Sequence, residues 1–198
     1  KRVHRMVDDQ SDGIARALAE AADEGIHVLD PDRWESEQRR FLRSYFLTEL
    51  LPVLTPMAVQ ELDPPPLLPE LQLNLCLLLR RSQGPDRAER IAVVPVPTQF
   101  PRFITVPGES GVNLARLEDA IAANVGMLFP GYDVAGCVFF RITRDADVAI
   151  QDDEAGDLLQ TVEQAVLTRR RRAAVRLELS APPQRAIRNW LVHWLELR

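Results

Sequence analysis

The residues best suited to chemistry in this 198-residue chain lie between Phe139 and Ile150, in the stretch FFRITRDADVAI. Two arginines and two aspartates lie there among apolar residues: Arg141, Arg144, Asp145 and Asp147. Aspartates two positions apart suit a hard cation such as Mg²⁺, and the arginines Arg141 and Arg144 are candidate contacts for an anion. Carboxylates between arginines are more simply satisfied by ion pairs, so a structural role for the four charges is the favoured interpretation.

As a β-strand, this stretch separates apolar and charged side chains onto two faces. Alternation places seven residues on the apolar face: Val134, Gly136, Val138, Phe140, Ile142, Ala146 and Val148. Arg141 lies on the opposite face, whereas Arg144 falls on the apolar side. The break in the pattern predicts that the strand ends in a turn near Arg144.

A second candidate site is the run of four arginines at residues 169–172, which could bind phosphate or nucleic acid. The helix predicted to end there begins with acidic residues at 152–154. Acids at the N-terminus of a helix and arginines at its C-terminus both stabilise it through the macrodipole. Four consecutive residues also spread around a helical turn and cannot all face one ligand, so a structural role is again favoured.

No catalytic residue, metal ligand or cofactor contact is predicted in this chain. The three histidines, His4, His27 and His193, are far apart in sequence and belong to no catalytic motif. Lys1 is the only lysine, and the sequence has no glycine-rich phosphate loop and no nucleophile-elbow or zinc-protease motif.

The composition is that of a globular protein, with 46% hydrophobic and 27% charged residues. The net charge of −5 argues against a nucleic-acid protein. No apolar run is long enough for a membrane helix, and we expect a cytoplasmic location. Because the sequence lacks an initial Met, we expect it to be a fragment of a longer protein.

Hydrophobic periodicity predicts an α+β fold. Residues 1–55 are expected to form a helical segment, with one helix over 3–24 and a second that starts at Asp30 and Pro31. Residues 56–198 are expected to form a mixed, largely antiparallel sheet with packed helices. Its predicted elements are strands at 71–79, 90–96, 102–106 and 174–179, the strands around 134–150, and helices at 114–129, 152–172 and 182–197. Leucines at alternate positions predict that the first of these strands has one apolar face and one polar face.

Several segments together resemble the type 1 polyphosphate kinases of bacteria. The segment CVFFRITRDADVAI, followed by an acidic-start helix, the arginine run and AAVRLEL, is similar to a motif series of that family. The similarity extends upstream through LEDAIAANVGMLFPG, VPVPTQFPRFITVP, LPELQLNLCLLLR and FLRSYFLTELLPVLTPMAV, in the family's order. In the connector, DPPPLLP stands where family members often carry a His-Pro-Phe-Pro-Phe type of segment.

The resemblance implies the end of the family's N-terminal domain (1–55) and its middle, or head, domain (56–198), truncated at its C-terminus. It implies a parent enzyme that moves the terminal phosphate of ATP to polyphosphate, with Mg²⁺, through a phosphohistidine in C-terminal domains outside this chain. Its implied partners are those domains, polyphosphate and a second copy in a dimer. This chain would then supply scaffold, dimerisation and tunnel framing and be inactive alone. The alternatives are a stand-alone interaction module, or an anion-binding domain that uses residues 169–172.

Overall fold

The structure, a computed structural model, describes residues 2–59, 62, 66, 68–83, 89–145 and 174–197. The chain forms two compact units, of which unit 1 comprises Lys1–Val53 and Pro97–Met127, and unit 2 comprises Leu54–Val96 and Leu128–Arg198. The division of the family domains between residues 55 and 56 stays a prediction, and the nearest change of unit falls between Val53 and Leu54.

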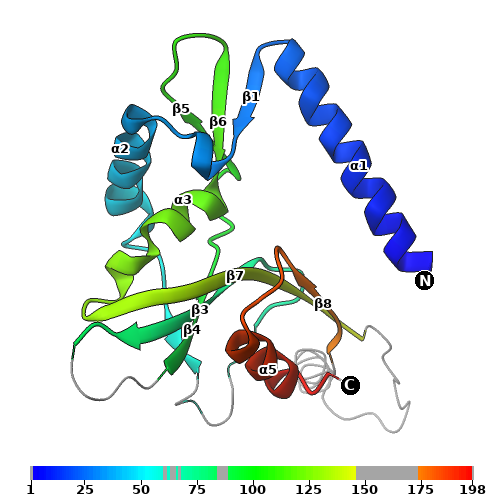
Figure 1. Ribbon diagram of the computed structural model, residues 1–198, viewed down its shortest axis with the longest axis vertical. Coiled ribbons are helices and arrows are strands. Elements are labelled where there is room, and N and C mark those ends of the chain that lie inside the picture. Colours follow the sequence, from blue (N-terminus) through cyan, green and yellow to red (C-terminus); the bar gives the residue numbers. More distant parts are fainter. Residues whose placement is uncertain are drawn as a thin grey trace, which may run out of the picture. The chain divides into compact units, whose positions relative to one another are not determined.

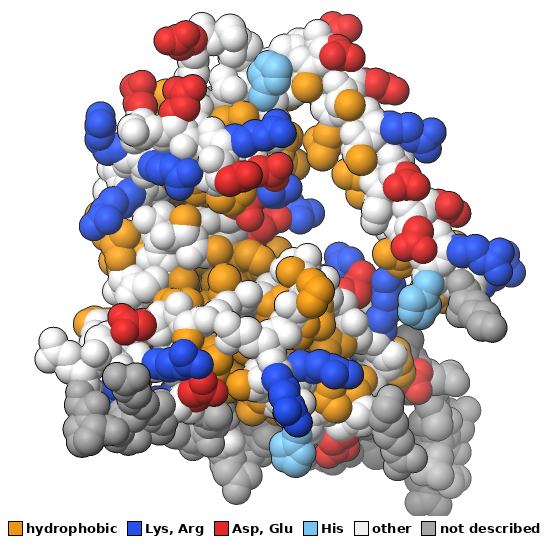
Figure 2. Space-filling view, viewed as in Figure 1, with side chains coloured by type: hydrophobic (Ala, Val, Ile, Leu, Met, Phe, Trp, Pro, Cys, Tyr) orange, Lys and Arg blue, Asp and Glu red, His pale blue; other side chains and the backbone are white. Residues whose placement is uncertain are grey.

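Unit 1 opens with the predicted first helix, α1 (Arg2–Asp23), which contains no buried residue. Its apolar side chains form a strip along the helix, seen in Figure 2, with charged side chains beside it. Gly25 ends the helix with a φ of +81°, a conformation that glycine adopts without strain. The short segment after it is a strand, β1 (Ile26–Leu29).

The second helix of unit 1 starts later than predicted. Asp30 and Pro31 begin only a 3₁₀ turn, η1 (Pro31–Arg33). The α-helix α2 (Ser36–Tyr45) begins with a capping box, in which the Glu35 backbone N–H donates to Gln38 Oε1 at 3.0 Å. It continues as a π-helical segment, η2 (Phe46–Leu50), whose Phe46 and Leu50 are buried.

A three-stranded sheet completes unit 1, in the order β1-β6-β5. β6 (Val112–Arg116) runs parallel to β1 and antiparallel to β5 (Phe103–Val106). The helix expected to begin at residue 114 instead begins three residues later, as α3 (Leu117–Asn124) with the 3₁₀ turn η4 (Val125–Leu128). The residues before it, Leu114 to Arg116, are paired in the sheet and cannot be helical.

Unit 2 contains a five-stranded sheet in the order β2-β4-β3-β7-β8 (Figure 1). Every neighbouring pair is antiparallel. The strands are β2 (Met57–Ala58), β3 (Asn74–Arg81), β4 (Glu89–Pro95), β7 (Tyr132–Arg144) and β8 (Ala174–Leu179). The helix α5 (Arg185–Trp194) packs on one face of this sheet through Ile187 and Leu191. The predicted α+β fold is confirmed.

The central strand β3 is buried on both faces, which the alternating leucines did not predict. Leu75, Leu77 and Leu79 are at most 4% exposed, but so are Cys76 and Leu78 on the opposite face. Cys76 and Leu78 join the core that α5 covers, together with Phe140 of β7. A strand in the middle of a covered sheet becomes apolar on both sides, and this masks the period of two.

Strand β7 ends at Arg144, as its sequence predicts. Its apolar face is not continuous, because the pairing with β3 shifts between Leu78 and Leu79, which lie opposite Gly136 and Val134. This β-bulge puts Val134 and Gly136 on different faces, so the prediction that they share one was wrong. The helix expected at 152–172, with its arginine run, lies outside the described residues.

Candidate functional site

The candidate anion contact Arg141 lies on the face of β7 away from α5 and is paired across the sheet. It lies directly opposite Glu178 of β8. Its Nε donates to Glu178 Oε2 at 2.9 Å and its Nη2 to Oε1 at 3.1 Å. Arg176, on the same strand as Glu178, approaches Oε1 at 3.0 Å. Two guanidinium groups thus share one carboxylate. We call Arg141, Arg176 and Glu178 together the β8 ion cluster.

The β8 ion cluster is a surface arrangement that holds two strands together. The Arg141 hydrogen bonds lower the pKa of the Glu178 carboxyl below its ordinary value, and burial acts in the opposite direction. The side chains of Arg141 and Arg176 stay 46% and 40% exposed, so the pairs contribute less than about 1 kcal/mol. An external anion could bind these arginines only in competition with Glu178.

The other candidate, Arg144, lies where β7 and β8 lose their regular register, opposite Ala174. Its backbone N–H donates to Glu70 Oε1 at 3.4 Å, which ties the strand end to the connector before β3. Burial lowers the pKa of the Arg144 guanidinium, and the Glu70 carboxylate acts in the opposite direction. Asp145 is exposed, and Asp147 lies outside the described residues. The structure therefore does not test the Mg²⁺ interpretation of the two aspartates.

A second group of ion pairs, in unit 1, was missed by sequence reasoning. Arg116 pairs with Asp119 and, at 2.7 Å, with Asp30. Arg102 pairs with the nearly buried Glu118 at 2.7 Å. Burial raises the pKa of the Asp119 carboxyl, although the hydrogen bond and charge of Arg116 act against it. The pairs of Arg116 with Asp30 and of Arg102 with Glu118 join segments that are distant in sequence, so no local spacing could have revealed them.

The three histidines lie on three different elements. His4 lies on α1, His27 on β1 and His193 on α5. In the part of the chain that the structure describes, no group of three or more His, Cys, Asp or Glu side chains could hold a metal ion. In the same residues, no histidine forms a hydrogen bond with a nucleophile that it could activate or with a carboxylate that could orient it.

Unit 2 also carries a hollow of about 860 Å³ beside α5, which we call the aromatic groove. Trp190 and Trp194 stack on each other in it, with ring centroids 4.7 Å apart and ring planes 21° from parallel. Trp194 also meets Phe140 of the core edge-on, at 6.3 Å. Both indoles are only partly buried.

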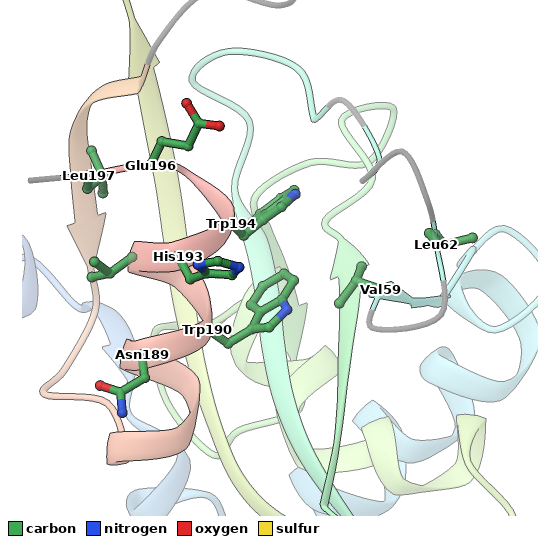
Figure 3. Close-up of a pocket in the computed structure, with 9 residues that line it drawn as sticks. Val59, Leu62, Asn189, Trp190, His193, Trp194, Glu196 and Leu197 are labelled. Carbon is green, nitrogen blue, oxygen red and sulfur yellow. The ribbon is translucent and has the colours of Figure 1, made fainter.

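Figure 3 shows the two walls of the aromatic groove. Trp190 and Trp194 rise from α5 and point toward Val59 and Leu62, which form the facing wall. The remaining lining residues are Asn189, Val192, His193, Glu196 and Leu197. This arrangement can accept an apolar group between its walls, with a few polar side chains at the rim.

No helix within the described ranges is both long enough and apolar enough to cross a lipid bilayer.

Comparison with known proteins gives a consistent family. Residues 37–198 match the family model described as polyphosphate kinase middle domain. The polyphosphate kinase of Thermosynechococcus vestitus is 38% identical over 200 residues, which cover 98% of this chain and 26% of that protein. That of Halalkalibacterium halodurans is 41% identical over 156 residues, or 78% of this chain and 22% of that protein.

A solved structure supports the fold. The crystal structure of polyphosphate kinase from Porphyromonas gingivalis superposes with a TM-score of 0.59 and 23% sequence identity, over 77% of this chain and 24% of that one. The chain thus spans about a quarter of the length of the curated relatives that it matches.

Proposed function

The chain belongs to the polyphosphate kinase family, and from this we propose that it acts as scaffold within an ATP:polyphosphate phosphotransferase and performs no chemistry itself. Phosphoryl transfer needs a nucleophile, metal-bridged phosphates and cations arranged around the transferred group. The proposal makes the middle domain a support for a site whose reactive groups lie elsewhere in the polypeptide.

The observation that carries this proposal is the pairing of Arg141, the strongest candidate for a contact with an anion. Arg141 donates two hydrogen bonds, through Nε and Nη2, to Glu178, a residue of the neighbouring strand. A cation that clamps a reacting phosphate must present its donors to that phosphate. An arginine already held by a carboxylate within its own sheet is better suited to fixing the sheet.

Three further roles belong to the proposal. The domain would contribute to a homodimer, and it would frame the tunnel in which the chemistry occurs. Arg141 and Arg144, at the end of β7, are the candidate contacts for polyphosphate, an anionic polymer that would have to compete with Glu178 and Glu70. ATP and Mg²⁺ would be bound by other domains, and the enzyme would be cytoplasmic.

The direct test is incubation of the purified chain with γ-labelled ATP and Mg²⁺. We expect no label on the chain and no polyphosphate, whereas the Thermosynechococcus vestitus enzyme should produce both under the same conditions. Label that is acid-labile and base-stable on His4, His27 or His193 would show that this chain is a catalyst.

A chimera provides the complementary test. This chain replaces the matching 26% of the Thermosynechococcus vestitus polyphosphate kinase, to which it is 38% identical. We expect the chimera to make polyphosphate. Arg141→Ala in the chimera should leave the turnover number nearly unchanged and act mainly on stability. A collapse of turnover in a folded Arg141→Ala chimera would show a direct role in catalysis.

A further inference from the structure

The aromatic groove exposes apolar surface that the described residues leave uncovered. Val192 on its helical side is 37% exposed and Leu62 on its facing wall is 44% exposed. The stacked indoles of Trp190 and Trp194 face Leu62 across the groove, as Figure 3 shows. Partly buried tryptophans in a hollow lined by apolar side chains are the residues that most often dominate the energy of an interface.

The rim of the groove indicates the chemistry of an occupant. Neither indole N–H donates a hydrogen bond to another residue in the described part of the chain. A buried indole N–H usually finds an acceptor, so an occupant that covers the rings should supply a carbonyl oxygen. Glu196 at the rim would accept a hydrogen bond from a backbone N–H or a basic side chain. An apolar polypeptide segment meets all of these requirements.

The size of the groove indicates a tethered occupant. Nine residues line it, whereas a stable interface between separate proteins uses about 20–30 residues on each side. A segment that belongs to the same polypeptide docks at a high effective concentration and needs far less contact surface. Roughly three quarters of each matching relative lies outside the region that this chain covers, which supplies such segments.

We infer that the aromatic groove is a docking surface for an apolar segment of the polyphosphate kinase polypeptide from outside this chain. The inference rests on the proposed function, because it requires this chain to work as part of that enzyme. It adds the surface, centred on Trp190 and Trp194, through which the middle domain is held to another part of the polypeptide.

Residue-resolved oxidation by hydroxyl radicals tests the docking. The reactivity of Trp190 and Trp194 is compared between the isolated chain and the chimera, with the buried Trp34, 4% exposed, as internal reference for unfolding. We expect both indoles to be reactive in the isolated chain and protected severalfold in the chimera. Equal reactivity in the two proteins overturns the inference. Low reactivity already in the isolated chain also overturns it, because the groove is then covered without the rest of the enzyme.

Two matched variants and a dilution series complete the test. In the chimera, Val192→Asp should abolish the protection of both indoles, whereas Val175→Asp, on β8 and 60% exposed, should not. If the V192D chimera keeps full protection of both indoles, the aromatic groove is not the docking surface. Protection of the isolated chain that disappears on about tenfold dilution identifies a second copy as the occupant and overturns the inference. None of these outcomes involves phosphorylation of this chain, so they are separate from failure of the proposed function.

Discussion

The side-chain amide of Gln184 lies directly over the Cα atom of Gly136. Gln184 Nε2 donates to the carbonyl oxygen of Ala135 at 2.6 Å, and a Cβ atom at position 136 would lie 2.5 Å from Gln184 Cδ. Gln184 is the N-cap of α5, and Gly136 lies in the bulge of β7. The contact therefore fixes the start of the helix on the sheet.

Gly136→Ala should lower the free energy of unfolding by about 1 kcal/mol, because the new methyl group displaces the Gln184 amide and breaks its hydrogen bond. Gln184→Ala should cost a similar amount. In the Gln184→Ala background, adding Gly136→Ala should cost nothing further, since the atoms that would clash are gone. Urea unfolding of the two single variants and the double variant measures the coupling, and strictly additive losses would contradict this account.

Phe140→Ala should lower the free energy of unfolding by about 3–5 kcal/mol, because Phe140 is 1% exposed and packs on Trp194. Arg141→Ala, one position along the strand, should cost about 1 kcal/mol or less, since its ion pair is exposed to water. The pair is a matched comparison of the two faces of β7. Large and equal losses would mean that the face of Arg141 is also covered.

The pKa values of Glu178 and Asp119 should be shifted in opposite directions from their ordinary values. The pKa of Glu178 is lowered, so the contribution of its carboxylate to the free energy of unfolding is present above pH 4.5. That contribution is lost as the pH falls through the folded pKa of Glu178. The pKa of Asp119 is raised by burial, so folding favours its protonated form and stability decreases as the pH rises above 3.8 through its folded pKa. Carboxyl NMR titration of wild type, Glu178→Gln and Asp119→Asn assigns both shifts. Titration curves that give both carboxyl groups their ordinary pKa values would contradict both predictions.

Glu196→Gly should stabilise the chain by about 1 kcal/mol. Glu196 follows the end of α5 with a φ of +52°, a conformation that is strained for residues other than glycine. The Leu197 N–H donates to the Val192 carbonyl oxygen at 3.1 Å, the bond that closes a helix at such a position. Thermal unfolding should show a higher midpoint for Glu196→Gly and no gain for Glu196→Ala, which keeps the Cβ atom. An equal gain in both variants would point to the charge of Glu196 as the cause.

Elements with strong local signals were predicted correctly from the sequence. The helix α1 has a regular apolar stripe and a glycine stop, and β7 ends where Arg144 breaks the alternation. The family resemblance, based on motifs in a fixed order, was confirmed by the match over residues 37–198. In each case the information lies within a short stretch of sequence.

Several of the errors share one cause, which is dependence on distant residues. Residues 114–116 of β6 were predicted as the start of a helix, but they are a strand because β1 and β5 pair with them. The partner of Arg141 is Glu178, on another strand, so the spacing within FFRITRDADVAI could not identify it. The aromatic groove was missed because Val59 and Leu62 are far in sequence from the two tryptophans.

The division of the chain between the two units has a consequence for its synthesis on the ribosome. The N-terminal helix and β1 emerge first, but the parallel partner of β1 begins only at Val112. Between them the ribosome must deliver β2, β3 and β4, which belong to the other unit. Those strands must in turn wait for β7, which starts at Tyr132. Neither unit has all of its strands before Val112 has been added, so a nascent chain that stalls before Val112 would expose unpaired strand edges from both.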